Sequence, residues 1–263
     1  MELRGARVLL TGAAGGIGSA TALALRSRGA ELVISGRNKT ALDELAARVG
    51  ARVEVADLAE RAQLHSLLER AGEVDVLVAN AALPAAGRLE SFSELEIDRA
   101  LEVNLHAPII MARVLVPQML ARGRGHLVFM SSISGKAYSA RTSIYCTTKF
   151  GLRGFAGALR ADLHGTNVGA SAVFPGFVSD AGMFVTSGAK LPPGVATRTP
   201  EQVAEGVVRA IERDIAEVDV APFSIRVGAA VAGVAPDATA RLQRMLGSDR
   251  VSEEMEAGHR ERR

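Results

Sequence analysis

The chain has 263 residues, 48% of them hydrophobic and 23% charged, so it can bury a substantial core as one large α/β domain or two small ones. Its formal charge of +2 comes from scattered arginines rather than a basic block, which argues against a nucleic-acid partner. Cys146 is the sole cysteine, which excludes an internal disulfide, argues against a cysteine-built metal site and favours the reducing cytoplasm.

Apolar runs rich in Val, Leu and Ile alternate with helical patterns along the chain. The expected strands are residues 7–11, 31–35, 51–56, 74–79, 125–132 and 168–174. Near-continuous apolar strands separated by helices predict a parallel sheet that is covered on both faces and joined by right-handed crossovers. The expected fold class is therefore α/β, a Rossmann-type doubly wound parallel sheet with helices on both faces, in a single domain over residues 1–247.

The segments outside this alternation carry weaker patterns. Residues 91–122 are helical but contain Pro108 and Pro117, which predicts a kinked helix or two helices. Residues 176–199 are rich in Gly, Pro, Ser and Thr and are expected to form a long functional loop. A helix should begin at Thr199, and AEVDVAP, residues 216–222, is a candidate last strand.

The C-terminal part divides into two segments. Residues 223–247 are apolar and suit a pocket wall or a partner surface better than membrane contact, because Arg226 and Pro236 interrupt them. Residues 248–263 are charged and are expected to form a flexible tail. No uncharged run is apolar and long enough to predict a membrane span.

The stretch TGAAGGIG follows the first strand and opens a helix. Glycine allows a sharp turn and lets a pyrophosphate approach the free N–H groups at the helix N-terminus. The simpler alternative is a glycine-rich turn that only packs helix on strand. The candidate cofactor-binding residues of this turn are Thr11, Gly12, Gly15, Gly16, Ile17 and Gly18.

Tyr145 and Lys149 are four residues apart in a helical pattern, so their side chains should share one helix face. An ammonium beside a phenol favours the phenolate and lowers the tyrosine pKa toward working pH, which suits proton exchange with a carbonyl or alcohol. The pair alone is more typical of an ordinary helix surface, and only the neighbouring motifs favour a catalytic role.

T-G-x-x-x-G-I-G and Y-x-x-x-K together resemble the cofactor and catalytic motifs of short-chain dehydrogenases/reductases, and the resemblance spans about Leu3 to Pro222. It implies that Ser132, 13 residues before Tyr145, is the catalytic serine, with Ser131 as the competing hydroxyl. It also implies that Asn104 completes a tetrad with Ser132, Tyr145 and Lys149.

The resemblance implies direct hydride transfer between a nicotinamide C4 and a substrate carbon. Tyr145 would exchange the proton, Ser132 would hold the substrate oxygen, and Lys149 would lower the tyrosine pKa and bind the nicotinamide ribose. Asn104 would hold a water molecule that relays protons past Lys149.

The remaining cofactor residues follow the second, third and fourth strands. Gly36 stands where NAD-binding sites place an acid and Arg37 follows, which favours NADP(H) over NAD(H) unless Arg37 is an ordinary surface residue. By resemblance, Asp57 and Leu58 lie beside the adenine, although Asp57 could equally cap the next helix. Asn80 and Ala81 match the family's N-N-A-G loop only in part.

After the sixth strand, Pro175, Gly176 and Val178 match the family pattern P-G-x-V-x-T. Asp180 replaces the threonine that holds the nicotinamide carboxamide, so the placement of the nicotinamide is in doubt. Residues 176–199 would then form a substrate lid, and its apolar side chains, Met183, Phe184, Val185 and Leu191, favour a hydrophobic carbonyl or alcohol substrate.

The function expected is thus an NAD(P)-dependent oxidoreductase of a small hydrophobic molecule, assembled as a homodimer or homotetramer by family resemblance. Two alternatives keep the same fold: a non-catalytic NADP-binding regulator, and a scaffold that binds no cofactor. The four catalytic residues argue against the first alternative, and the glycine turn argues against the second.

Overall fold

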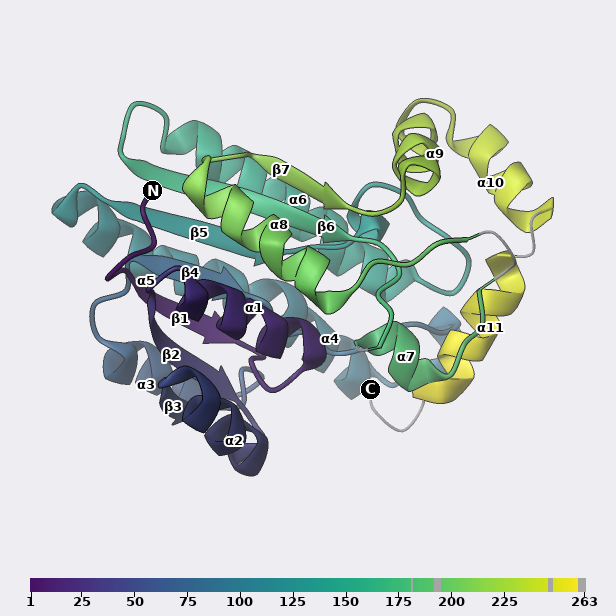
Figure 1. Cartoon of the computed structure of the whole chain (residues 1–263). Coiled ribbons are helices and arrows are strands. Elements are labelled where there is room, and N and C mark those ends of the chain that lie inside the picture. The colour runs from purple at the N-terminus through teal and green to yellow at the C-terminus, as the bar shows by residue number, and fades with distance from the viewer. Residues whose placement is uncertain (181, 192–194, 246–247, 260–263) are drawn as a thin grey trace.

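A computed structural model describes residues 1–180, 182–191, 195–245 and 248–259, and in these ranges the strands form one parallel sheet (Figure 1). The strand order is β3-β2-β1-β4-β5-β6-β7. The predicted doubly wound α/β class is confirmed, and the strands lie within two residues of the predicted bounds. They are β1 (Arg7–Thr11), β2 (Glu31–Gly36), β3 (Arg52–Val55), β4 (Val76–Ala79), β5 (Gly125–Met130), β6 (Val168–Pro175) and β7 (Glu217–Val220).

Two apolar layers flank the sheet because successive strand residues face opposite sides. Val8 and Leu10 of β1 pack toward one set of helices, whereas Leu9 packs toward the other. The first layer contains α1 (Gly16–Ser27), α2 (Lys39–Val49) and α8 (Pro200–Glu212), and the second contains α3 (Arg61–Ala71), α5 (Ala107–Arg122) and α6 (Ser143–Asp162). Burial on both faces explains why the strands are apolar throughout.

Successive strands are added in one direction from β1 to β3 and in the opposite direction from β4 onward, so the strand order switches between β1 and β4, which pair in parallel. Ligands of open α/β sheets bind at such a switch point, beyond the carboxyl ends of the strands. The glycine turn follows β1 and the Asn80 loop follows β4, so the fold brings two predicted cofactor segments together.

The helical region over residues 91–122 is divided into two helices, as predicted, and the division falls at a π turn. A short 3-10 turn (Leu89–Ser91) precedes α4 (Glu94–Leu101), which continues through a π-helical turn (Glu102–His106) into α5. Pro108 is the second residue of α5 and directly follows the π turn, and Pro117 lies inside α5. The irregularity therefore lies at the π turn, which contains Asn104, and π turns of this kind are frequent at functional sites.

The stretch Glu94–Arg122 is long and apolar enough to cross a membrane by length and composition. In the structure, however, Met111, Leu115 and Met119 are buried in the layer between α5 and the sheet. The packing of the sheet accounts for its apolar residues.

The C-terminal part is more ordered than predicted. Figure 1 shows α7 (Met183–Ser187), α9 (Phe223–Val234), α10 (Pro236–Met245) and α11 (Ser248–His259) beyond the carboxyl ends of the strands. The prediction of a flexible tail over residues 248–263 is therefore wrong for the part that α11 covers, and residues 260–263 lie outside the described ranges. Likewise α7 interrupts the loop predicted over 176–199, of which 181 and 192–194 are not described.

A buried polar cluster lies between β5 and β6, near the amino end of β5. His126 Nε2 is 2.8 Å from Ser171 Oγ, which itself donates to the Ile215 carbonyl at 2.6 Å. Ser171 must then accept from His126, which assigns the proton of the neutral imidazole to Nε2. Burial lowers the pKa of His126 to about 4, although Asp214 nearby acts in the opposite direction.

The lowered pKa of His126 should make the free energy of unfolding depend on pH. Unfolded His126 takes up a proton as the pH falls through about 6.5, whereas the folded form stays neutral down to about 4. The free energy of unfolding should therefore fall by up to about 3 kcal/mol over this window, measured by urea unfolding at a series of pH values. His126→Gln should flatten that pH dependence, and a matched change at the exposed His65 should leave it intact.

Candidate active site

The glycine turn between β1 and α1 is closed by contacts that leave no room for a side chain at Gly12 or Gly18. Gly12 has φ +65°, and a Cβ there would lie 2.7 Å from the Cα of Ala81. A Cβ at Gly18 would overlap the carbonyl oxygen of Gly12. Gly15 meets only that same oxygen, at 3.5 Å. The turn is therefore a backbone cradle at a helix N-terminus, which fits the pyrophosphate of a dinucleotide.

The Asn80 loop holds this cradle in place. The Asn80 side-chain amide donates to the carbonyls of Thr11 and Gly12, at 3.1 Å each. The backbone N–H groups of Asn80 and Ala81 both donate to Thr11 Oγ1 at 3.2 Å. The loop is thus firmly bonded despite its departure from N-N-A-G, and these residues shape the cradle.

Asp57 lies between two guanidinium groups after β3. Arg99 Nη2 donates to Asp57 Oδ2 at 2.8 Å, and Arg37 Nη1 lies 3.9 Å from the same oxygen. Asp57 also accepts the backbone N–H of Ala59, while the N-cap position of α3 is Glu60. The alternative of Asp57 as the helix cap is therefore wrong. Arg99 was absent from the predicted site, since nothing in its own sequence neighbourhood distinguishes it.

The two serines after β5 point in different directions. Ser131 Oγ donates to the Lys149 carbonyl at 2.9 Å in the buried core. Ser132 Oγ lies 3.5 Å from the Pro175 carbonyl and accepts the N–H of Ser134, and it is close enough to the Tyr145 phenol to lower the pKa of that group. Ser132 and Tyr145 thus meet, as the predicted site requires, and Ser131 does not join them.

Tyr145 and Lys149 face the same space from one side of α6, and the Lys149 Nζ is 5.5 Å from the Tyr145 ring centre. Burial raises the pKa of Tyr145 to about 12, and the hydrogen bond from Ser132 opposes it only in part. Burial also lowers the pKa of Lys149 to about 8. The prediction of a lowered tyrosine pKa is therefore wrong for the structure, because desolvation outweighs the effect of Ser132, the one group that lowers this pKa.

Lys149 is 2% exposed, and its ammonium donates to the Met130 carbonyl at 2.8 Å. Asn104 is fully buried in the π turn, where its amide both accepts from and donates to the backbone of Leu83, at 2.6 and 2.9 Å. Asn104 therefore fixes the segment after β4 against α4 and α5. Its role in holding a relay water stays a prediction.

The segment after β6 is pinned at both ends. Gly176 N–H donates to the Val220 carbonyl at 3.0 Å, and Val178 pairs with Arg198 in an isolated parallel bridge. Asp180 is exposed and has φ +62°, a conformation that aspartate tolerates better than the expected threonine. The backbone thus gives a reason for Asp180 that is independent of the nicotinamide.

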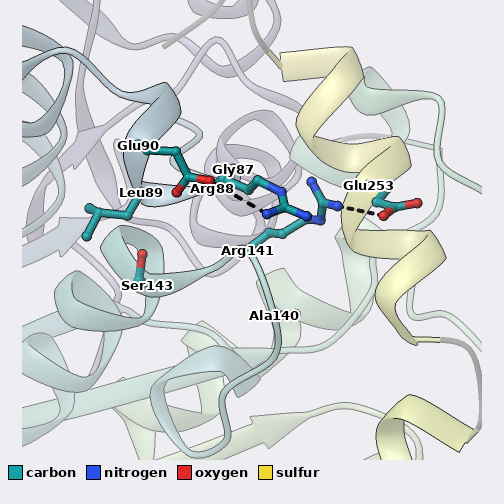
Figure 2. Close-up of a pocket in the computed structure, with 8 residues that line it drawn as sticks. All are labelled: Gly87, Arg88, Leu89, Glu90, Ala140, Arg141, Ser143 and Glu253. Atoms are coloured by element: carbon teal, nitrogen blue, oxygen red, sulfur yellow. Dashed lines mark hydrogen bonds and ion pairs between the residues drawn. The ribbon is translucent and has the colours of Figure 1, made fainter.

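The C-terminal helix α11 joins the lid to the loop before α6. Arg141 has φ +61°, and its guanidinium pairs with Glu253 at 2.6 Å (Figure 2). It also pairs with Glu256 at 2.6 Å. Glu254 accepts the backbone N–H of Lys190 at 2.8 Å, beyond α7. A polar cavity of about 410 Å³ lies beside these contacts, lined by Gly87, Arg88, Leu89, Glu90, Ala140, Arg141, Ser143 and Glu253.

Glu256→Gln should loosen this connection because the Arg141 side chain, 17% exposed, would lose the better buried of its two carboxylates. We expect the amide protons of α11 to exchange faster than in wild type, measured by amide hydrogen exchange. Glu253→Gln is the matched control, since that carboxylate is 57% exposed and its removal should have a smaller effect on exchange. Equal protection of α11 in wild type and Glu256→Gln would contradict the expectation.

Comparison with known proteins agrees with this geometry. Residues 6–191 match the family model described as short chain dehydrogenase. The chain is 34% identical over 259 residues to the ketoacyl reductase HetN of Nostoc sp., which covers 93% of this chain and 90% of the relative. It is 31% identical over 180 residues to a 3-oxoacyl-[acyl-carrier-protein] reductase, FabG, of Rickettsia prowazekii, covering 68% of this chain and 75% of the relative.

Among solved structures, a short-chain dehydrogenase from Sphingobium yanoikuyae in complex with NADPH superimposes with a TM-score of 0.76 at 26% identity. The match covers 88% of this chain and 96% of that one. The protein therefore belongs to the short-chain dehydrogenase/reductase family, an oxidoreductase family that binds a nicotinamide cofactor.

Proposed function

We propose that the protein is an NADP(H)-dependent oxidoreductase that interconverts a hydrophobic carbonyl compound and its alcohol. The observation that carries this proposal is the meeting of Tyr145 with Ser132, beside the buried Lys149, at the carboxyl end of the sheet. The similarity to an NADPH-bound relative supports the choice of cofactor.

The residues present fit a dinucleotide. The cradle from Thr11 to Gly18 would hold the pyrophosphate, and Arg37, 57% exposed, would receive a 2′-phosphate. Asp57 and Leu58 would flank the adenine, Lys149 the ribose, and Pro175, Gly176 and Val178 the nicotinamide. When bound, the nicotinamide would supply or accept a hydride.

The side chains of the site would manage the proton. Because the pKa of Tyr145 is about 12, the residue is a neutral phenol at pH 7 and can donate its proton to a carbonyl oxygen. Ser132 would orient that oxygen through its hydroxyl. Lys149, with a pKa of about 8, is mostly cationic at pH 7 and would stabilise the phenolate that the proton transfer leaves.

The substrate is proposed to carry an apolar chain next to its carbonyl. Helix α7 supplies apolar surface through Met183, Phe184 and Val185. The ring of Phe184 packs edge-on against that of Phe177, with 5.2 Å between the ring centres. Two relatives are named as ketoacyl reductases, which makes 3-oxoacyl thioesters the first compounds to test. A cytoplasmic homodimer or homotetramer remains our proposal for location and assembly.

Two measurements test the proposal. Fluorescence titration with NADPH and NADH should show tighter binding of NADPH. Oxidation of NADPH should then be followed with 3-oxoacyl thioesters, ketones and aldehydes of increasing chain length. Tight NADPH binding with no turnover on any of them would instead favour the non-catalytic regulator, and absence of binding would exclude both functions.

A further inference from the structure

Asp57 places a negative charge where the proposed cofactor would bring its 2′-phosphate. Arg37 follows β2 and Asp57 follows β3, two adjacent strands, so both lie at the same edge of the sheet. The distance between Arg37 Nη1 and Asp57 Oδ2 is 3.9 Å. An uncompensated carboxylate there would repel the phosphate and would also hold Arg37 for itself.

Arg99 supplies the compensating charge. Its Nη2 donates to Asp57 Oδ2 at 2.8 Å, a charge-assisted hydrogen bond, whereas the Arg37 contact is too long for one. The side chain of Asp57 is 24% exposed and that of Arg99 is 36% exposed, so water screens this pair less than it screens Arg37, which is 57% exposed.

The helix that carries Arg99 has a well-capped N-terminus. At the N-terminus of α4, Ser93 Oγ accepts the N–H of Glu96 and Glu96 Oε2 accepts the N–H of Ser93, which forms a capping box. Arg99 lies one turn further along the same helix. It therefore reaches Asp57 from a rigid element rather than from a loop.

We propose that Arg99 is a positioning residue for cofactor selectivity: by pairing with Asp57, it leaves the Arg37 guanidinium available for the 2′-phosphate of NADP(H). This inference rests on the proposed function, and deepens it by assigning the selectivity to three residues rather than to Arg37 alone. Asp57 then contributes to the site in the form of an ion pair with Arg99.

Equilibrium binding of two cofactor fragments tests this without turnover. Calorimetry would compare 2′,5′-ADP, which carries the 2′-phosphate, with 5′-AMP, which lacks it. We expect Arg99→Gln to reduce the preference for 2′,5′-ADP by about five- to tenfold, because Asp57 would then repel the phosphate and recruit Arg37. Binding of 5′-AMP should change by less than about twofold, since it carries no 2′-phosphate.

Three further variants separate charge compensation from a structural effect. Arg99→Lys keeps the charge and should keep most of the preference. The double variant Asp57→Asn with Arg99→Gln removes both charges and should restore the preference that Arg99→Gln loses. Arg209→Gln, at an exposed position near the end of α8, makes the same change in net charge and should have no effect.

The outcomes distinguish the inference from the proposed function. A wild-type protein that binds 2′,5′-ADP no better than 5′-AMP would overturn both the NADP(H) assignment and the role of Arg99. A clear wild-type preference that Arg99→Gln leaves unchanged would overturn the inference alone. Equal weakening of both fragments, without rescue by Asp57→Asn, would also overturn it.

Discussion

Tyr145→Phe is expected to lower kcat by about 10³-fold while NADPH affinity stays within about twofold of wild type. The phenol oxygen is the group that would give its proton to the carbonyl, and phenylalanine removes that oxygen alone. The Tyr145 ring beside Lys149 would remain as a phenyl ring of the same size, so the fold around α6 should be kept. Steady-state kinetics and fluorescence titration of the same preparation would measure both quantities.

The chain provides a matched control in its other tyrosine. Tyr138 lies before α6 in the same loop region and is 50% exposed. Tyr138→Phe removes an identical hydroxyl and should leave kcat within about twofold, as expected for a surface change. Substantial residual turnover in Tyr145→Phe would remove the residue from the proposed proton transfer.

The sheet could be predicted from the sequence because burial on both faces makes its strands locally distinctive. Leu9 and Leu10 face different layers and are both fully buried, so the apolar run marks the strand directly. α11 lacked such a local pattern. Its acidic residues look solvated in the sequence, and the contacts that tie the helix to the rest of the fold come from distant residues such as Arg141 and Lys190.

The candidate site could be predicted only in part. The spacing of Tyr145 and Lys149 placed both on one helix face, and the choice of Ser132 over Ser131 followed from the resemblance to the family's motif. The direction of the Tyr145 pKa was not predictable, since it depends on how completely the surrounding elements bury the phenol. Arg99 and the π turn at Asn104 depend equally on contacts between elements distant in sequence.

The glycine turn gives the second large expected effect. Gly18→Ala should lower the free energy of unfolding by about 3 kcal/mol, because the added Cβ would overlap the Gly12 carbonyl oxygen and lie 2.7 Å from the Ala13 Cα. Both obstacles are backbone atoms, so no flexible side chain can move aside. The turn itself would have to shift, and NADPH affinity should fall with it because the cradle is formed by that backbone.

Gly15→Ala separates this collision from the general cost of losing a glycine. Gly15 has φ −75° and ψ 160°, which alanine adopts without strain, and its Cβ would lie 3.5 Å from the same Gly12 oxygen, an ordinary contact. Urea unfolding should therefore place Gly15→Ala within about 0.5 kcal/mol of wild type. If the two variants were equally destabilised, the close packing of Gly18 against Gly12 could not be the reason that the turn requires glycine there.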